Sequence, residues 1–119
     1  MQSYRELIVW QKGIQLVVDI YEITSKFPKE EIFGMTSQMR RAALSIPSNI
    51  AEGYARKHRK EYGQFIRIAF GSGAELETQL IVAKKLNLIS EEKLRNIDTL
   101  LCEIMKMLNK LSSTLSQNN

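Results

Sequence analysis

The sequence predicts an all-α protein, an antiparallel up-down-up-down four-helix bundle. Apolar residues recur at steps of three and four along four segments, which places them on one face of a helix in each segment. These helices span roughly residues 5–26, 35–55, 60–86 and 90–115. The connections between them are short, as in bundles of antiparallel neighbours, and no segment resembles a strand. The 119 residues, 1–119, fit a single domain.

The first predicted helix follows a capping-box pattern, in which Ser3 and Glu6 stand three residues apart. Pro28 ends this helix, because a residue that precedes proline, here Phe27, is pushed away from helical geometry. Residues 28–34 then connect it to the second helix. The expected core face of the first helix is the stripe of Leu7, Trp10, Ile14, Val17, Tyr21 and Thr24.

The second predicted helix contains Pro47, which donates no N–H and costs about 3 kcal/mol in a helix interior. Two structures are compatible with this residue. The helix runs through Pro47 with a kink, or it ends and restarts with Pro47 in its first turn. The apolar spacing continues unchanged from Ala43 through Ile46 to Ile50, which favours the kinked continuous helix.

The third predicted helix contains Gly71 and Gly73, and a glycine inside a helix costs about 1 kcal/mol relative to alanine. We therefore expect a neighbouring helix, or a large side chain such as Trp10, to approach closely there. After the helix, Asn87 suits the left-handed conformation of a helix C-terminus, with Leu88 folded back on the last turn.

The fourth predicted helix has the most regular pattern. Ser90 is its expected N-cap, and Glu91 and Glu92 suit the positive end of the helix dipole. Its heptad seam consists of Leu94, Ile97, Leu101, Ile104, Leu108, Leu111 and Leu115. Further apolar residues lie off the main stripes of the first and fourth helices, and part of this surplus predicts burial against another subunit. They are Ile8, Val9, Ile20, Ile23, Leu100, Met105 and Met107.

The composition indicates an ordered and moderately basic protein. Hydrophobic residues make up 44% and charged residues 25%, which is ordinary for a globular domain. The net charge of +4 is compatible with a nucleic acid or an acidic protein as partner. The single cysteine, Cys102, allows no internal disulfide, so we expect a reducing, cytoplasmic location. We find no signal peptide and no apolar run of about 20 residues, and we expect no membrane partner.

The residues that common catalytic and metal sites need are scarce. One histidine, His58, and one cysteine cannot build a di-iron site or a Cys/His zinc site. No acidic residue is placed to orient His58, and no phosphate-binding loop is present. We therefore expect no catalytic residue, no metal and no cofactor, and we interpret the chain as a non-enzyme.

The turn between the second and third helices concentrates positive charge. It contains Arg56, Lys57, Arg59 and Lys60. Two interpretations stand side by side: a solvated turn, or a tip that contacts phosphates and binds nucleic acid.

A second charged set predicts an inter-helix polar network of Arg40, Arg41, Glu75 and Glu77. Antiparallel packing of the second and third helices would place Arg40 near Glu75. We favour this structural role for the arginines over direct contact with nucleic acid, since a buried pair fixes the register of two helices.

Four motifs together are distinctive: VWQK at residues 9–12, FP at 27–28, QMRRAALSIPSNIAEG at 38–53 and GSGAELETQL at 71–80. At this spacing they resemble the 23S rRNA intervening-sequence proteins, four-helix bundles related to the accessory protein of diversity-generating retroelements. The resemblance covers nearly the whole chain. It implies a bacterial source, a homopentamer, association with nucleic acid and no enzymatic activity. The family's motif positions fall on Trp10, Arg40, Arg41, Pro47, Asn49, Glu52, Gly53, Glu75 and Glu77.

Charge and resemblance together predict a non-enzymatic, oligomeric bundle that binds nucleic acid. We expect RNA rather than DNA as the ligand, bound through basic residues with low sequence specificity. The alternative is a protein-interaction scaffold that docks a nucleic-acid enzyme such as a reverse transcriptase. A salt titration of RNA and DNA binding separates the two.

Overall fold

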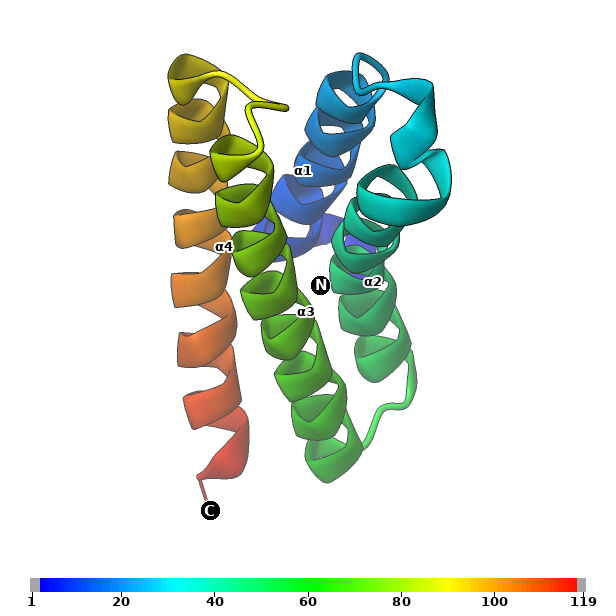
Figure 1. The fold of residues 1–119 in the computed structure, drawn as a ribbon. Coiled ribbons are helices and arrows are strands. Elements are labelled where there is room, and N and C mark those ends of the chain that lie inside the picture. Colours follow the sequence, from blue (N-terminus) through cyan, green and yellow to red (C-terminus); the bar gives the residue numbers. More distant parts are fainter. Residues whose placement is uncertain (1–2, 118–119) are drawn as a thin grey trace.

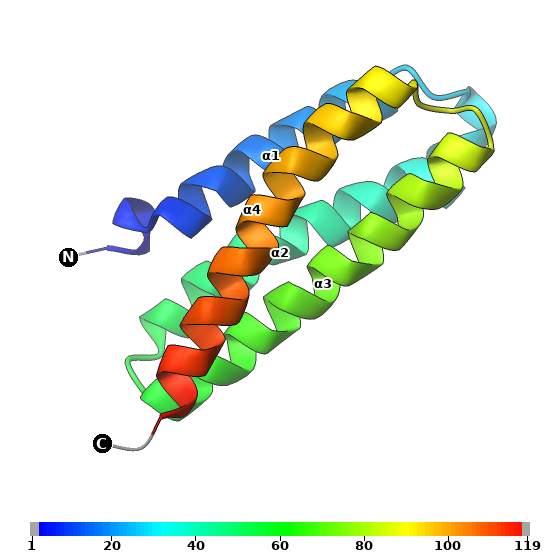
Figure 2. The ribbon, with the colours of Figure 1, turned by 90° about the vertical axis from the view of Figure 1, so that its left-hand side faces the viewer.

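The computed structural model describes residues 3–117, and these residues form four long helices and no strand. The helices are α1 (Ile8–Thr24), α2 (Ser37–Ala55), α3 (Arg59–Lys85) and α4 (Glu91–Ser116). Shorter elements are the 3-10 turns η1 (Tyr4–Glu6) and η2 (Lys29–Glu31) and the π-helical turn η3 (Ile32–Thr36). The helices pack into one elongated bundle of 49 × 21 × 20 Å (Figure 1 and Figure 2), which confirms the predicted all-α four-helix bundle.

Contacts between paired positions show that each of these helices runs antiparallel to the next. Within each pair of helices, the residue number rises along one helix as it falls along the other. The contacts are Gly13–Pro47 and Thr24–Arg40 for α1 with α2, Ser45–Ser72 and Gly53–Phe65 for α2 with α3, and Gly73–Met105 and Gly63–Leu115 for α3 with α4. The connections accordingly alternate between the two ends of the bundle (Figure 1).

The core contains side chains from all four helices. The large side chains that are fully buried are Leu16, Ile20, Met39, Ile46, Ile50, Ile66, Leu76, Leu80, Leu101, Ile104 and Leu108. The core face of α1 differs from the predicted stripe, because Ile14 and Tyr21 are 38% and 42% exposed while Leu16 and Ile20 are buried. Gly13 explains the rotation of α1: a Cβ built on it would lie 3.4 Å from the Cβ of Pro47, so α1 turns its glycine toward α2.

Helix α2 continues without a break through the buried Pro47 to Ala55, which confirms the continuity that the apolar spacing favoured. Polar side chains on the side of α2 that packs on α3 connect this part of the two helices. The Asn49 side chain donates to the carbonyl oxygen of Ser45 at 2.7 Å and to its hydroxyl at 2.9 Å. The hydroxyls of Ser45 and Ser72 are 2.8 Å apart, so a short polar chain links the two helices beside the proline.

The two glycines of α3 have different surroundings. Gly73 is buried, and a Cβ there would collide with the sulfur of Met105 from α4, so close approach explains this glycine. The approaching side chain is therefore Met105 and not Trp10. Gly71 is exposed, and a Cβ there would meet nothing within 4 Å.

The ends of the helices follow their capping chemistry. Ser90 caps α4 by accepting a hydrogen bond from the backbone N–H of Lys93 at 3.2 Å. Asn87 has a positive φ of 62°, and the N–H of Leu88 donates to the carbonyl of Ala83 at 2.9 Å, as predicted for the end of α3. Ser3 caps the short turn η1 instead of a long helix, and α1 begins at Ile8 rather than near residue 5.

Candidate nucleic-acid interface

The basic turn lies at the end of the bundle where α4 also ends (Figure 1). Its residues 56–60 are all exposed. Lys57 adopts the left-handed backbone conformation with φ of 60°, and His58 returns to extended geometry with φ of −122° before α3 starts. The His58 side chain makes no capping hydrogen bond with α3. The tight turn therefore leaves four cationic residues and one histidine exposed at this end of the bundle.

Two of the four cations already have protein partners. Arg56 forms ion pairs with Glu52 at 3.1 Å and Glu61 at 3.8 Å, and its guanidinium carbon lies 5.1 Å from the centroid of the Phe65 ring. Arg59 donates a hydrogen bond from Nη2 to the backbone carbonyl of Thr114 near the end of α4. Arg56 is thus partly neutralised, and Arg59 ties α3 to α4.

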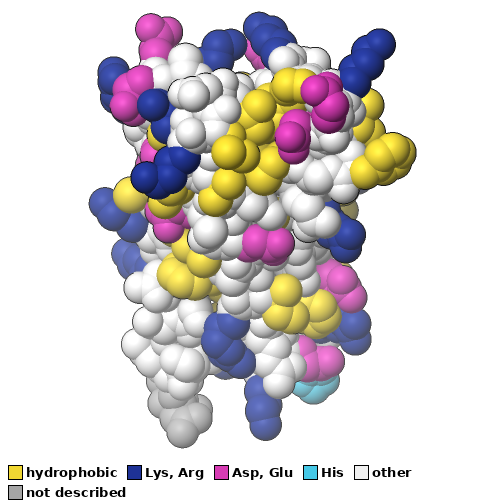
Figure 3. Space-filling view, viewed as in Figure 1, with side chains coloured by type: hydrophobic (Ala, Val, Ile, Leu, Met, Phe, Trp, Pro, Cys, Tyr) yellow, Lys and Arg dark blue, Asp and Glu magenta, His cyan; other side chains and the backbone are white. Residues whose placement is uncertain are grey.

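The other two cations, Lys57 and Lys60, make no hydrogen bond and no ion pair with residues 3–117. Figure 3 shows Lys and Arg side chains near this end of the bundle, beside the histidine and an acidic side chain. The turn therefore offers two free ammonium groups on a background of partly paired arginines, an arrangement that suits phosphate contacts.

The two tyrosines that flank the turn pack on each other. The rings of Tyr54 and Tyr62 meet edge to face, with centroids 5.8 Å apart and planes at 88°. Burial, and then the proximity of Tyr54, raise the pKa of the Tyr62 hydroxyl above its ordinary value. A base would have to compete with this contact, so the pair is a poor platform for stacking.

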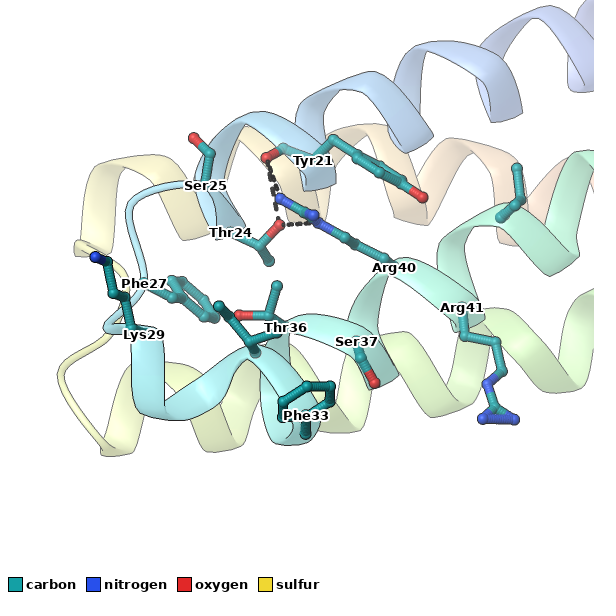
Figure 4. Close-up of a pocket in the computed structure, with 12 residues that line it drawn as sticks. Tyr21, Thr24, Ser25, Phe27, Lys29, Phe33, Thr36, Ser37, Arg40 and Arg41 are labelled. Atoms are coloured by element: carbon teal, nitrogen blue, oxygen red, sulfur yellow. Dashed lines mark hydrogen bonds between the residues drawn. The ribbon is translucent and has the colours of Figure 1, made fainter.

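The expected pairing of Arg40 with Glu75 needs correction, because Arg40 turns toward α1. Its Nε donates to the Thr24 hydroxyl at 2.9 Å and its Nη2 to the carbonyl of Tyr21 at 3.3 Å (Figure 4). Its guanidinium carbon lies 4.4 Å from the centroid of the Tyr21 ring. Arg40 lies on the face of α2 that packs on α1, whereas Ser45 marks the face that packs on α3.

The other members of the predicted network also remain apart. Arg41 is exposed and makes no hydrogen bond or ion pair with residues 3–117. Glu75 accepts a hydrogen bond from Gln79 at 3.3 Å within α3. Glu77 is exposed and faces α4, where its charge helps to raise the pKa of Asp98. The four residues therefore do not form one network between α2 and α3.

Sequence reasoning missed a groove at the opposite end of the bundle. It has a volume of about 610 Å³ and lies between the end of α1, the turns η2 and η3, and the start of α2. The sequence shows residues 28–34 only as a short connection. The available signal was Ile32-Phe33, two large apolar residues in a polar connection, both of which are exposed.

The described residues do not bring metal-binding side chains together. Within residues 3–117, no group of three or more His, Cys, Asp or Glu side chains could hold a metal ion. None of the helices in this part of the chain is long and apolar enough to cross a membrane.

Fold and charged turn together define the class of protein, a small helical bundle with a cationic end. Residues 5–110 match the family described as 23S rRNA-intervening sequence protein, and the chain belongs to this family. A similar solved structure is the crystal structure of a protein of unknown function from the S23 ribosomal protein family of Bacteroides thetaiotaomicron. It is 25% identical, with a TM-score of 0.83, and the match covers 89% of this chain and 96% of that chain. Comparison with curated proteins found no match.

Proposed function

We propose that this protein is a non-enzymatic, oligomeric bundle that binds RNA in preference to DNA through the basic turn between α2 and α3. The observation that carries the proposal is the left-handed backbone conformation of Lys57, which has a φ of 60°. This conformation costs a residue with a side chain about 1–2 kcal/mol, and glycine adopts it without that cost. Stability alone would favour glycine at this position, so the lysine at the tip of the turn is better explained by a binding role for its charge. Strained backbone conformations are frequent at binding sites.

The comparisons support RNA as the ligand. The description of the family names the intervening sequence of 23S rRNA, and the solved relative is assigned to a ribosomal protein family. Contacts from lysines to phosphates carry no sequence information, and Tyr54 and Tyr62 are occupied with each other. Low sequence specificity is therefore part of the proposal.

The test removes the two free charges and keeps the paired arginines. Lys57→Gln/Lys60→Gln should weaken RNA binding and lower the slope of log affinity against log salt by roughly 0.7 per lost phosphate contact on single strands. Lys85→Gln/Lys93→Gln removes the same charge from exposed positions at the other end of the bundle and serves as control. If both double variants bind RNA equally well, the turn is only solvated and the proposal fails.

Self-association is the second part of the proposal, with a homopentamer as our first choice. Exposed apolar side chains occur on α1 (Ile8, Ile14, Val18) and on α3 (Ile68, Ile81, Val82). In α4, by contrast, Leu100, Met105 and Met107 pack against the core. Helices α1 and α3 each pack mainly on α2 and α4, so their outer faces lie on opposite sides of the bundle. Two different faces suit a head-to-tail contact, which closes into a ring.

The alternative remains a scaffold that docks a nucleic-acid enzyme such as a reverse transcriptase. The exposed Phe33, at 94%, favours it, since a large exposed apolar side chain suits a protein contact. If Lys57→Gln/Lys60→Gln binds RNA as tightly as the parent, the scaffold is the better-supported function. In either function we place the protein in the cytoplasm, because the unpaired and exposed Cys102 suits a reducing compartment.

A further inference from the structure

The groove between α1, η3 and α2 has an unusual composition. Every charged side chain that lines it is a cation, namely Lys29, Arg40 and Arg41, and its lining contains no carboxylate. Four serine and threonine hydroxyls also line it, those of Thr24, Ser25, Thr36 and Ser37, together with the phenol of Tyr21. Its volume of about 610 Å³ lies within the range of sites for small molecules. These features suit an anion that carries hydrogen-bond acceptors.

Arg40 is a cation that the protein holds in place without neutralising it. Its hydrogen bonds to Thr24 and Tyr21, and its contact with the Tyr21 ring, fix the guanidinium beside the groove (Figure 4). No carboxylate among residues 3–117 pairs with it, and its Nη1 group makes no hydrogen bond there. A fixed guanidinium with a free amino group can bind a phosphate at little cost in side-chain entropy.

Thr36 adds an unpaired polar group to the same lining. Its side chain is only 6% exposed, and its hydroxyl has no hydrogen-bond partner. A buried hydroxyl without a partner is costly and needs an explanation. The hydroxyl oxygen is buried and points toward Phe27 in Figure 4, so the Thr36 side chain has to rotate about its Cα–Cβ bond before a phosphate oxygen in the groove can accept a hydrogen bond from it.

Phe33 places an open aromatic ring at the edge of the groove (Figure 4). It lies in η3 next to Gly34, whose φ of −113° and ψ of −111° break the helical geometry. The side chain is 94% exposed, so the ring faces are free to stack on a base, unlike those of Tyr54 and Tyr62.

We propose that this groove binds a single nucleotide, with the phosphate at Arg40 and Thr36 and the base on Phe33. Lys29 and Arg41 line the rim and point away from Arg40 in Figure 4, so they add positive potential without a fixed contact. A free nucleotide and a nucleotide within single-stranded RNA share this chemistry. The groove and the basic turn occupy opposite ends of the bundle, so the site does not depend on the turn (Figure 1).

Isothermal titration of the full chain with AMP, inorganic phosphate and adenosine tests the site. AMP should bind more tightly than either fragment, because only AMP carries both groups. Phe33→Ala should weaken AMP by about tenfold and leave phosphate binding unchanged, since it removes only the stacking surface. Thr36→Val should weaken both AMP and phosphate without lowering the melting temperature, because it removes an unpaired hydroxyl and keeps the shape of the side chain.

Arg40→Lys is the third variant, and it keeps the charge but loses the planar donor set, so phosphate and AMP should both bind at least about tenfold more weakly. Leu86→Ala, which shortens an exposed apolar side chain just after α3, controls for Phe33→Ala, and Lys57→Gln/Lys60→Gln should bind AMP like the parent. Loss of AMP binding in that turn variant would overturn the proposal.

Short single-stranded RNAs with and without a 5′-phosphate, tested as competitors of AMP in the Lys57→Gln/Lys60→Gln variant, identify the source of the nucleotide without a contribution from the turn. Binding of AMP alone indicates a free nucleotide, binding of the phosphorylated strand alone indicates a strand end, and equal binding of both strands indicates an internal nucleotide. The proposal fails if AMP gives no heat at millimolar concentration, or if adenosine binds as well as AMP. It also fails if Phe33→Ala lowers the oligomer mass without affecting AMP, because the groove then holds a second copy.

Discussion

Gly53 and Gly71 both lie inside helices, but the space around them differs. A Cβ on Gly53 would lie 2.6 Å from the Cβ of Phe65 and 3.3 Å from the carbonyl oxygen of Tyr62, whereas a Cβ on Gly71 would meet nothing within 4 Å. Gly71→Ala should therefore raise the free energy of unfolding by about 1 kcal/mol, because alanine favours a helix. Gly53→Ala should lower it by about 1–3 kcal/mol, because overpacking forces the helices apart.

Urea denaturation of both variants measures these changes. A loss of stability in Gly71→Ala would contradict the first expectation and would show that another copy of the chain covers this face of α3.

The two residues with positive φ, Lys57 at 60° and Asn87 at 62°, allow a matched pair of glycine substitutions. Each change to glycine should raise the free energy of unfolding, by about 1 kcal/mol for lysine and less for asparagine, which tolerates the left-handed conformation better. Only Lys57→Gly should weaken RNA binding, since Asn87 lies at the opposite end of the bundle and carries no charge.

Chemical denaturation and a filter-binding assay with RNA report the two effects separately. Equal RNA affinity in Lys57→Gly and Asn87→Gly would remove the functional reason for a lysine at the turn.

Arg40 and Arg41 are adjacent in the sequence, and the structure gives them different roles. Arg40→Ala should lower the free energy of unfolding by about 1–3 kcal/mol, because it removes charged hydrogen bonds to α1 and the contact with the Tyr21 ring. Arg41→Ala should change it by no more than about 0.5 kcal/mol, because this side chain is exposed and has no partner within residues 3–117. Thermal melts that show equal losses for the two variants would be inconsistent with these contacts.

The sequence identified Arg40 as structural but could not identify its partner. That partner depends on the rotation of α2 about its own axis, which is set by packing against all three other helices. A charge-pairing argument found Glu75, whereas the structure supplies a hydroxyl, a carbonyl and an aromatic ring from α1.

At the scale of the element, the regularity of the pattern decided which helix face could be predicted. The seam of α4 was unambiguous, and Ile97, Leu101, Ile104 and Leu108 are buried as expected. Helix α1 carries two apolar stripes, and nothing local to α1 distinguishes them. The choice depends on Gly13 meeting Pro47 of α2, a contact between residues far apart in the sequence.

The packing of α4 against α3 also creates a pH dependence at Asp98. Asp98 is exposed, but partial desolvation of its carboxyl, reinforced by the charges of Glu77 and Glu91, raises the pKa of this group above its ordinary value. A carboxyl with a raised pKa in the folded state contributes stability below its unfolded-state pKa and loses it as the pH rises through the folded-state pKa. At neutral pH the ionised Asp98 is therefore unfavourable.

Asp98→Asn should accordingly raise the melting temperature at about pH 7, and the gain should vanish near pH 3, where the parent carboxyl is protonated in both states. Melting curves across this range measure the effect, with Glu22→Gln on α1 as the control for loss of one charge. A gain that persists at low pH would point to a cause other than ionisation.

At the scale of the whole molecule, length and periodicity sufficed for the four-helix bundle, but not for its surface. The groove is made by α1, η3 and α2 together, and η3 contains the non-helical backbone of Gly34. No spacing rule reports such a turn, so Phe33 and Thr36 could not be recognised as neighbours of Arg40. The basic turn was predictable because its charges are contiguous in the sequence.

The placement of exposed apolar residues on opposite sides of the bundle leads to the last prediction. A head-to-tail ring needs both the α1 face and the α3 face of every copy, whereas a symmetric dimer needs one face only. Light scattering of the parent should give a mass several times 13.7 kDa. Val18→Glu on α1 and Ile68→Glu on α3, at positions 51% and 52% exposed, should each abolish the ring, while Thr99→Glu on the outer face of α4 should not.

Mixing the two disrupted variants then distinguishes a ring from other assemblies. The intact α1 face of Ile68→Glu can bind the intact α3 face of Val18→Glu, but the remaining faces of that pair are both blocked. The mixture should therefore stop at a mass of about two chains, whereas each variant alone stays monomeric. If only one of the two substitutions affects the parent assembly, the contact is isologous and a pentameric ring is excluded.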